Sequence, residues 1–366
     1  MYRHRPLFTA ALLFAAILAL LVAVGCDFSE EGRAKEAPIT GSNTTTIGAG
    51  GSTFIAPLMT RWVSSYEQAH PVRVNYRPIG SGAGIEEMKK GFLEFGVSDA
   101  PLSDDQVRQI APMIQVPASA GPVCIIYNLP SLSAPLRLSA RTLAGIYQGN
   151  IISWQDPAIA RDNPRAKLPH AAVIVVHRSD GSGTTSIFTH YLSSVDKNWS
   201  SNPGAGLTVK WPVGIGANGS KGVIEMVKQA PGAIGYLELS YAKKDGLPTA
   251  SIQNQAGHFV DPTPASAAAA ISAFSQALAS DVRSPIVNPP ASAEDAYPIA
   301  GLTFVLIRKD STNAVDQQAV KDFIAYAIST GQDSAEELSY AKLPEPVQKQ
   351  GQELLSQLTA NGRPLK

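Results

Sequence analysis

The alternation of short apolar runs with stretches of helical periodicity, which continues from Thr45 to the C-terminus, constrains the fold of this chain most. In "IAPLMTRWVSSYEQ" (55–68) apolar residues recur at spacings of three and one, the pattern of one helical face. The runs "VRVNY" (72–76) and "AAVIVVH" (171–177) have the length and composition of strands. Such alternation predicts an α/β fold with helices on the faces of a sheet. Further helices are predicted at 138–151, 184–194, 219–230, 265–279, 315–329 and 345–359, and a strand at 302–308.

Residues 1–25 have the features of an export signal peptide. Arg3 and Arg5 precede an apolar run from Leu7 to Gly25, and no acidic residue interrupts it. The run ends in "LVAVGC", which resembles the lipobox of bacterial lipoproteins and would make Cys26 the lipidated residue. An uncleaved transmembrane anchor is the alternative. Residues 26–44 are polar and aperiodic and are expected to form a flexible, lipid-anchored linker. Both interpretations tether the chain outside the cytoplasm, in the periplasm or at the cell surface.

The charge balance argues against a nucleic-acid partner. The chain has 30 basic and 30 acidic residues, and removal of Arg3 and Arg5 leaves 28 against 30, a formal charge of −2. A near-neutral surface exerts no general attraction on nucleic acid or anionic lipid. If Cys26 is lipidated, Cys124 has no cysteine to pair with, and we expect a buried, inert thiol there.

Three loops rich in glycine and hydroxyl residues lie where a strand is expected to lead into a helix. They are "GAGGSTF" (48–54), "GSGAG" (80–84) and "DGSGTT" (180–185). The first N–H groups of a helix have no internal partner, and the helix dipole adds partial positive charge there. Each loop could therefore hold an anion. For a single loop, simple helix capping is the better explanation, but three such loops together with Arg178 favour an anion site.

Other phosphate-binding and catalytic motifs fit these loops poorly. No lysine follows the glycines, as a P-loop requires, and Asp180 and Thr184 stand where a nucleophile elbow centred on Ser182 needs glycines. "GAGGST" lacks the third glycine of a dinucleotide fingerprint. Neighbouring strand residues point to opposite faces, so an inward Arg178 would turn His177 away from the site.

Asp99, in "EFGVSDAPLS", closes an apolar segment and is expected at the end of a strand. Ligand sites of α/β sheets lie at such ends. The alternative is that Asp99 only caps the following turn through its own backbone, and the two roles are compatible.

Seven segments, in this order, resemble the substrate-binding proteins of bacterial ABC-type phosphate importers. The resemblance covers nearly the whole mature chain, and it implies the type II periplasmic-binding-protein fold, with two α/β domains joined by a hinge and the ligand in the cleft between them. The domains would be residues 45–118 plus 297–366 and residues 119–296. The segments are "GSTFIAPLMTRW", "VNYRPIGSGAGI", "FGVSDAPLS", "LAGIYQGNIISWQDPAIARDNP", "VVHRSDGSGTTSIFTHYL", "VKWPVGIGANGSKGV" and "PGAIGYLELSYA".

The resemblance also implies the ligand and its contacts. Inorganic phosphate would be held from both domains, with Asp99 accepting the phosphate proton and Asp180 orienting Arg178. The implied phosphate contacts are Thr53, Phe54, Ser81, Asp99, Arg178, Ser182, Gly183 and Thr184. The implied partner is a permease with transmembrane subunits and a cytoplasmic ATPase. We expect a monomer that is not an enzyme and carries no cofactor or metal.

Two further functions remain open from the residues alone. Arsenate carries the same acidic proton as phosphate and would satisfy the same groups. A secreted phosphohydrolase could use Ser182 or Thr184 as nucleophile, but it would need a base or a metal cluster nearby, and the sequence has no His/Asp spacing of that kind.

Overall fold

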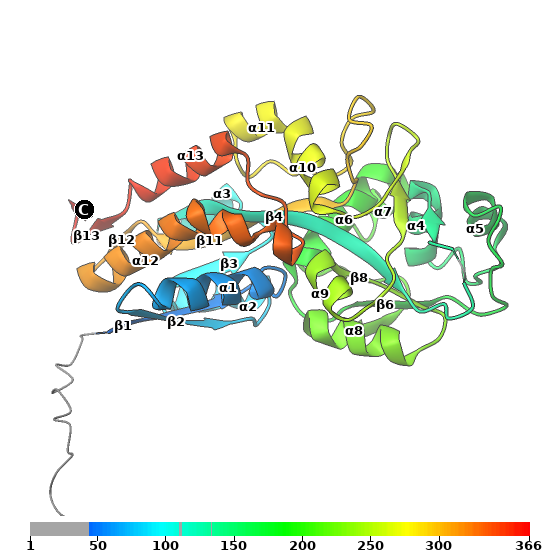
Figure 1. Ribbon diagram of the computed structural model, residues 1–366, viewed down its shortest axis with the longest axis horizontal. Helices are drawn as coiled ribbons and strands as arrows, with labels where there is room; N and C mark the ends of the chain where they lie inside the picture. The colour runs from blue at the N-terminus through cyan, green and yellow to red at the C-terminus, as the bar shows by residue number, and fades with distance from the viewer. Residues whose placement is uncertain (1–43, 110–111, 133) are drawn as a thin grey trace, which may run out of the picture. The chain divides into compact units, whose positions relative to one another are not determined.

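An eight-stranded sheet forms the centre of the fold, with the strand order β2-β1-β3-β11-β4-β8-β6-β7. The computed structural model describes residues 44–366 except 110–111 and 133. The predicted α/β class is confirmed, because helices accompany this sheet along the chain (Figure 1). The strands of the sheet are β1 (Thr45–Gly51), β2 (Val72–Arg77), β3 (Phe95–Ser98), β4 (Met113–Tyr127), β6 (Ile174–Arg178), β7 (Ile215–Ala217), β8 (Ala233–Glu238) and β11 (Ala300–Arg308).

The sheet contains two parallel groups joined by two long antiparallel strands. β1 pairs in parallel with β2 and β3, and β6 pairs in parallel with β7 and β8. β4 pairs with β11 over Met113–Pro122 and with β8 over Val123–Tyr127. Figure 1 shows β4 as one long strand that runs from the first group into the second. The predicted crossing near Ala118 falls within β4, and the predicted return near Tyr297 falls just before β11; the division into two domains remains a prediction.

Four predicted helices, at 55–68, 184–194, 219–230 and 315–329, begin and end within two residues of the predicted positions. Those predicted at 138–151 and 345–359 end four residues earlier, and α3, α5, α7 and α9 were not predicted. The single helix predicted at 265–279 is two helices, because Phe274 leaves the helical conformation at φ −107° and ψ 14°. The helices are α1 (Ala56–Glu67), α2 (Ser81–Lys90), α3 (Asp104–Gln109), α4 (Ala140–Tyr147), α5 (Pro157–Asp162), α6 (Gly183–Val195), α7 (Lys197–Ser201), α8 (Gly219–Gln229), α9 (Leu239–Lys244), α10 (Pro264–Ala273), α11 (Ser275–Ser280), α12 (Ala314–Ala327) and α13 (Glu345–Leu355).

Short elements complete the fold. Two small sheets have the strand orders β10-β9-β5 and β12-β13-β14. The short strands are β5 (Arg137–Leu138), β9 (Ser251–Gln253), β10 (Phe259–Val260), β12 (Asp310–Ser311), β13 (Thr359–Ala360) and β14 (Arg363–Pro364), and the 3₁₀ turns are η1 (Thr330–Ser334) and η2 (Glu336–Leu338).

The apolar face predicted for residues 55–68 is buried in the core. Leu58, Met59 and Trp62 of α1 are fully buried, and the Trp62 indole N–H donates to the Gly331 carbonyl at 2.8 Å. Every residue of β4 is buried, as a strand in the middle of a covered sheet requires. Cys124 of β4 is a buried free thiol.

The predicted signal peptide, Cys26 and the linker as far as residue 43 lie outside the described residues. Within the described part of the chain, no helix has the length and apolar character needed to cross a membrane.

Candidate functional site

The three glycine-rich loops meet at the carboxyl ends of β1, β3 and β6. The loop 48–54 completes β1 and leads to α1, the loop 80–84 begins α2, and the loop 180–185 joins β6 to α6. The Gly82 N–H donates to the Gly181 carbonyl at 2.9 Å, so the second and third loops touch directly. A Cβ at Gly80 would lie 2.7 Å from Asp180 Oδ2, and only glycine allows this approach.

Asp99, directly after β3, is a buried carboxylate that accepts several hydroxyl hydrogen bonds. Ser52 Oγ lies 2.8 and 2.6 Å from its two oxygens, and Thr303 Oγ1 donates to Oδ1 at 2.7 Å. Ser81 Oγ lies 3.4 Å from Oδ2. Burial raises the pKa of Asp99 to about 6, although the hydrogen bonds from Ser52 and Thr303 and the charge of Arg178 act in the opposite direction. The carboxylate therefore changes protonation close to neutral pH.

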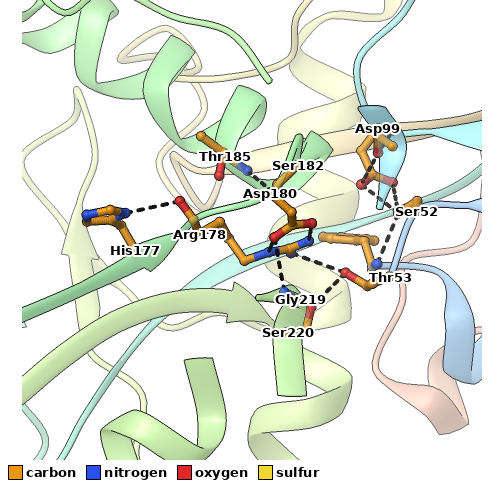
Figure 2. A network of polar contacts seen from close by, with 12 residues as sticks. Ser52, Thr53, Asp99, His177, Arg178, Asp180, Ser182, Thr185, Gly219 and Ser220 are labelled. Atoms are coloured by element: carbon orange, nitrogen blue, oxygen red, sulfur yellow. Dashed lines mark hydrogen bonds and ion pairs between the residues drawn. The ribbon is translucent and has the colours of Figure 1, made fainter. Parts of the chain in front are cut away.

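Arg178, at the end of β6, is held by a bidentate ion pair with Asp180. Its Nε donates to Oδ1 at 2.7 Å and its Nη2 donates to Oδ2 at 2.5 Å, while Gly219 N–H also donates to Oδ1 at 3.0 Å. Burial disfavours the charge of Arg178, but Asp180 outweighs burial, so the pKa of Arg178 is raised. The same pairing lowers the pKa of Asp180 despite its burial. Asp180 therefore fixes both the position and the charge of the guanidinium (Figure 2).

The guanidinium also reaches the first loop. Arg178 Nη1 donates to Thr53 Oγ1 at 3.1 Å. A guanidinium has five N–H groups, and the contacts to Asp180 and Thr53 use three of them. The other two N–H groups of Arg178 have no hydrogen-bond partner within the described residues.

The N-terminus of α6 presents further donors beside Asp99. Ser182 is the N-cap, and its Oγ accepts from the Thr185 N–H at 3.1 Å, so the capping alternative holds for this loop, whereas α1 and α2 have no side-chain cap. The N–H groups of Gly183 and Thr184 belong to the first turn and have no partner within the helix. A Cβ on Gly183 would lie 2.5 Å from Asp99 Oδ2 and 2.5 Å from Ser81 Oγ, which places this helix start against the carboxylate. Thr184 Oγ1 is buried and has no hydrogen-bond partner among the residues described.

The side chains of Phe54 and His177 are oriented away from this cluster, while the backbone of Phe54 lies within the first loop. The Phe54 ring is buried in the core against Tyr340, and its amide N–H donates to Ser52 Oγ at 3.0 Å. His177 stacks on Trp211 with the ring centroids 4.7 Å apart. Figure 2 shows His177 turned away from the Arg178 guanidinium, as predicted from strand alternation.

The structure adds residues that the sequence analysis did not identify. Ser52 and Thr303 bind Asp99. Tyr236 Oη accepts from the Arg178 backbone N–H at 3.1 Å and lies 2.6 Å from Thr185 Oγ1. Ser52 lies in the glycine-rich loop 48–54, so its hydroxyl could have been recognised as a candidate site group from the sequence. Thr303 and Tyr236 lie within apolar strands, where no local pattern marks them.

A second buried carboxyl group, Glu238, lies behind Thr53. Thr53 Oγ1 is 2.9 Å from Ser220 Oγ, which is 3.2 Å from Glu238 Oε2. Burial raises the pKa of Glu238 well above its usual value and the charge of Asp99 raises it further, whereas its own backbone N–H, the charge of Arg178 and the Ser220 hydroxyl lower it.

Neither a metal site nor a base for Ser182 is found among the described residues. Residues 44–366, without their undescribed positions, contain no group of three or more His, Cys, Asp or Glu side chains arranged to hold a metal ion. The Ser182 hydroxyl is engaged by the Thr185 amide and has no histidine or carboxylate partner in the part of the chain described. The arrangement combines many fixed donors with one buried acceptor, which suits binding of a protonated anion.

Comparison with known proteins identifies the family. Residues 37–330 match the model of the PBP superfamily domain. The phosphate-binding protein PstS of Xylella fastidiosa is 38% identical over 348 residues, which cover 91% of this chain and 95% of that protein. PstS of Pasteurella multocida is 40% identical over 305 residues, or 82% and 87% of the two chains. The chain belongs to the PstS family of phosphate-binding proteins.

Solved structures of phosphate-binding proteins have the same fold. One from Stenotrophomonas maltophilia has a TM-score of 0.64 at 19% identity and covers 84% of this chain and 93% of its own. One from Clostridium perfringens, solved with bound phosphate, has a TM-score of 0.60 at 18% identity, with 82% and 100% coverage. The predicted type II periplasmic-binding-protein fold is confirmed.

Proposed function

We propose that this protein is an extracytoplasmic binding protein that captures inorganic phosphate and delivers it to an ABC-type phosphate import permease. The observation that carries this proposal is the position of Asp99. Its buried carboxylate faces the first turn of α6, where a Cβ on Gly183 would lie 2.5 Å from Oδ2. One hydrogen-bond acceptor, the Asp99 carboxylate, among several N–H and O–H donors suits an anion that itself carries a hydrogen.

The proposed ligand contacts come from both parallel groups of the sheet. Arg178 supplies the full positive charge through its two remaining N–H groups, and the α6 start supplies backbone N–H groups and hydroxyls. Fixed dipoles of this kind match the oxygens of a tetrahedral anion. We propose that phosphate contacts Thr53, Phe54, Ser81, Asp99, Arg178, Ser182, Gly183 and Thr184, with Asp180 as the support of Arg178.

Asp99 is proposed to distinguish phosphate from sulfate. At neutral pH phosphate carries at least one hydrogen that Asp99 can accept, whereas sulfate carries none and would place two negative charges in contact. An uncompensated buried charge pair costs several kcal/mol, which is a discrimination of about a thousandfold. Arsenate carries the same hydrogen and remains the alternative ligand.

The remaining parts of the proposal concern the cellular context. We propose a lipid anchor at Cys26, a monomeric state and no catalytic activity. Ligand contacts from both sides of the molecule mean that phosphate would stabilise the closed form, which a permease can then recognise. A colorimetric phosphatase assay should detect no hydrolysis; turnover that depends on Ser182 would contradict the assignment as a binding protein.

Titration calorimetry of the purified protein with phosphate, arsenate and sulfate tests the proposed function. Arg178→Ala should weaken phosphate binding by about 2 to 5 kcal/mol, because a desolvated charge-assisted contact is lost. The matched control is Arg161→Ala, at an exposed position of α5, which should bind as the wild type does. Native affinity in Arg178→Ala would show that the site is assigned wrongly.

A further inference from the structure

A continuous chain of buried hydroxyl groups connects the candidate site to Glu238 at the end of β8. Arg178 Nη1 donates to Thr53 Oγ1 at 3.1 Å, Thr53 Oγ1 is 2.9 Å from Ser220 Oγ, and Ser220 Oγ is 3.2 Å from Glu238 Oε2. Thr53 is 9% exposed, and Ser220 and Glu238 are each 1% exposed. Water therefore has little access to these groups, so their hydroxyl and carboxyl hydrogens must form hydrogen bonds within the chain itself.

The surroundings of Glu238 disfavour a negative charge. Its Oε1 is buried and has no hydrogen-bond partner among the described residues. Its own backbone N–H, the charge of Arg178 and the Ser220 hydroxyl favour the charged form, but burial outweighs them. The Arg178 guanidinium is already paired with Asp180, and Asp99 adds a further negative charge. Among the described residues, the other titratable groups that interact with Glu238 are the Cys124 thiol of β4, the Tyr241 phenol of α9 and the Tyr340 phenol, all of which are neutral near pH 7.

The protonation state of Glu238 determines which way the hydroxyl hydrogens point. An ionised Glu238 can only accept, so Ser220 would donate to it and accept from Thr53. The single hydroxyl hydrogen of Thr53 would then point away from the ligand.

A protonated Glu238 reverses this order. Its Oε2–H donates to Ser220 Oγ, and Ser220 donates to Thr53 Oγ1. Thr53 Oγ1 then accepts from Ser220 and from Arg178, which can only donate. The hydroxyl hydrogen of Thr53 is left free to point at an oxygen of the anion.

We propose that Glu238 carries a proton, with or without ligand, and, through Ser220, directs the hydroxyl hydrogen of Thr53 toward the bound anion. Glu238 is thus a positioning residue that does not touch the ligand. The inference rests on the proposed phosphate site, since Thr53 is one of its contacts. In this proposal Glu238 acts as a protonated carboxylic acid, a role distinct from that of Asp99.

The two carboxyl groups, Asp99 and Glu238, change protonation in different pH ranges. Burial raises the pKa of Glu238 well above its usual value. As the pH rises through that pKa, Glu238 ionises, the hydroxyl chain reverses and a negative charge appears close to the anion. Phosphate affinity therefore falls on the alkaline side. Asp99, with a pKa of about 6, is already ionised there and cannot cause this loss.

Infrared difference spectroscopy tests the proton without using phosphate. Spectra of the wild type and Glu238→Gln are compared in the ligand-free protein at a pH well above the pKa of about 6 of Asp99. The substitution should remove a carbonyl band of a protonated carboxylic acid. Loss of carboxylate bands instead would overturn the proposal. This result stands even if the wild type fails to bind phosphate, which would contradict the proposed function separately.

Binding measurements test the direction of the chain. Thr53→Val removes the hydroxyl donor and should weaken phosphate binding about tenfold, as expected for one lost hydrogen bond. Glu238→Gln, whose amide N–H can donate to Ser220, should bind within about threefold of the wild type and lose the alkaline decline. Glu225→Gln, on the exposed side of α8, is the matched control and should retain that decline.

The opposite arrangement has a distinct outcome. If Glu238 is ionised, Ser220→Ala frees the Thr53 hydrogen and Glu238→Gln removes a nearby charge, so both variants would bind phosphate more tightly. Thr53→Val would then have little effect. Tighter binding by both variants would overturn the proposal.

Discussion

At the scale of single residues, Asp99 is the group whose protonation is expected to control specificity. Its pKa of about 6 lies above the usual value of an aspartate, so it ionises as the pH rises through about 6 and is neutral below that. A neutral Asp99 can donate a hydrogen bond to sulfate. We therefore expect sulfate binding, measured by calorimetry, to strengthen as the pH falls through about 6.

Asp99→Asn provides the control for this pH effect. Its neutral amide should admit sulfate at every pH, so the pH dependence of sulfate binding should disappear. A wild type that rejects sulfate equally on both sides of pH 6, or an Asn variant that still rejects it, would show that Asp99 is not the discriminating acceptor.

At the scale of secondary-structure elements, Tyr236 of β8 aligns the end of β6 with the start of α6. Its hydroxyl accepts from the Arg178 N–H at 3.1 Å and lies 2.6 Å from Thr185 Oγ1. Tyr236→Phe leaves both buried groups without this partner, which typically costs about 1 to 3 kcal/mol. The free energy of unfolding in urea should fall by that amount. Phosphate affinity should also weaken, because Arg178 loses a backbone support.

Tyr191 of α6 is a matched control for the same chemical change. It is fully buried like Tyr236, but its hydroxyl has no hydrogen-bond partner within the described residues. Tyr191→Phe should therefore leave the stability unchanged or increase it slightly, because an unsatisfied polar atom is removed. Equal losses in the two variants would mean that the Tyr236 hydrogen bonds contribute nothing.

At the scale of the whole folded unit, close approach of the loops requires a glycine at position 183. A Cβ there would lie 2.5 Å from both Asp99 Oδ2 and Ser81 Oγ, which is too close for any side chain. Gly183→Ala should keep the protein folded but prevent the loops from meeting. Calorimetry should show phosphate binding weakened at least tenfold, and small-angle scattering should show that phosphate no longer compacts the molecule.

Gly222 of α8 is the control for the closure experiment. A Cβ at Gly222 would meet its nearest neighbour at 3.6 Å, an ordinary contact. Gly222→Ala should bind phosphate and compact as the wild type does. Compaction by phosphate in Gly183→Ala would contradict the proposed closure.

Local features of the chain were predictable because they depend on neighbouring residues. The buried face of α1 follows from a period of 3.6, and the start of α6 follows from a serine cap and glycine after a strand. The opposite directions of His177 and Arg178 follow from strand alternation. The break at Phe274 was not predictable, since the apolar spacing continues across it.

The sequence alone determined the order of strands, loops and caps, because hydrophobic periodicity and capping act over a few residues. The α/β class and the three helix starts follow from that order. The partners of Asp99 and Thr53 were decided only by the tertiary structure. Thr303 is 204 positions from Asp99, and Ser220 is 167 positions from Thr53. A hydroxyl on an apolar strand has no local signature, and its role depends on which buried carboxylate the fold brings within about 3 Å of it.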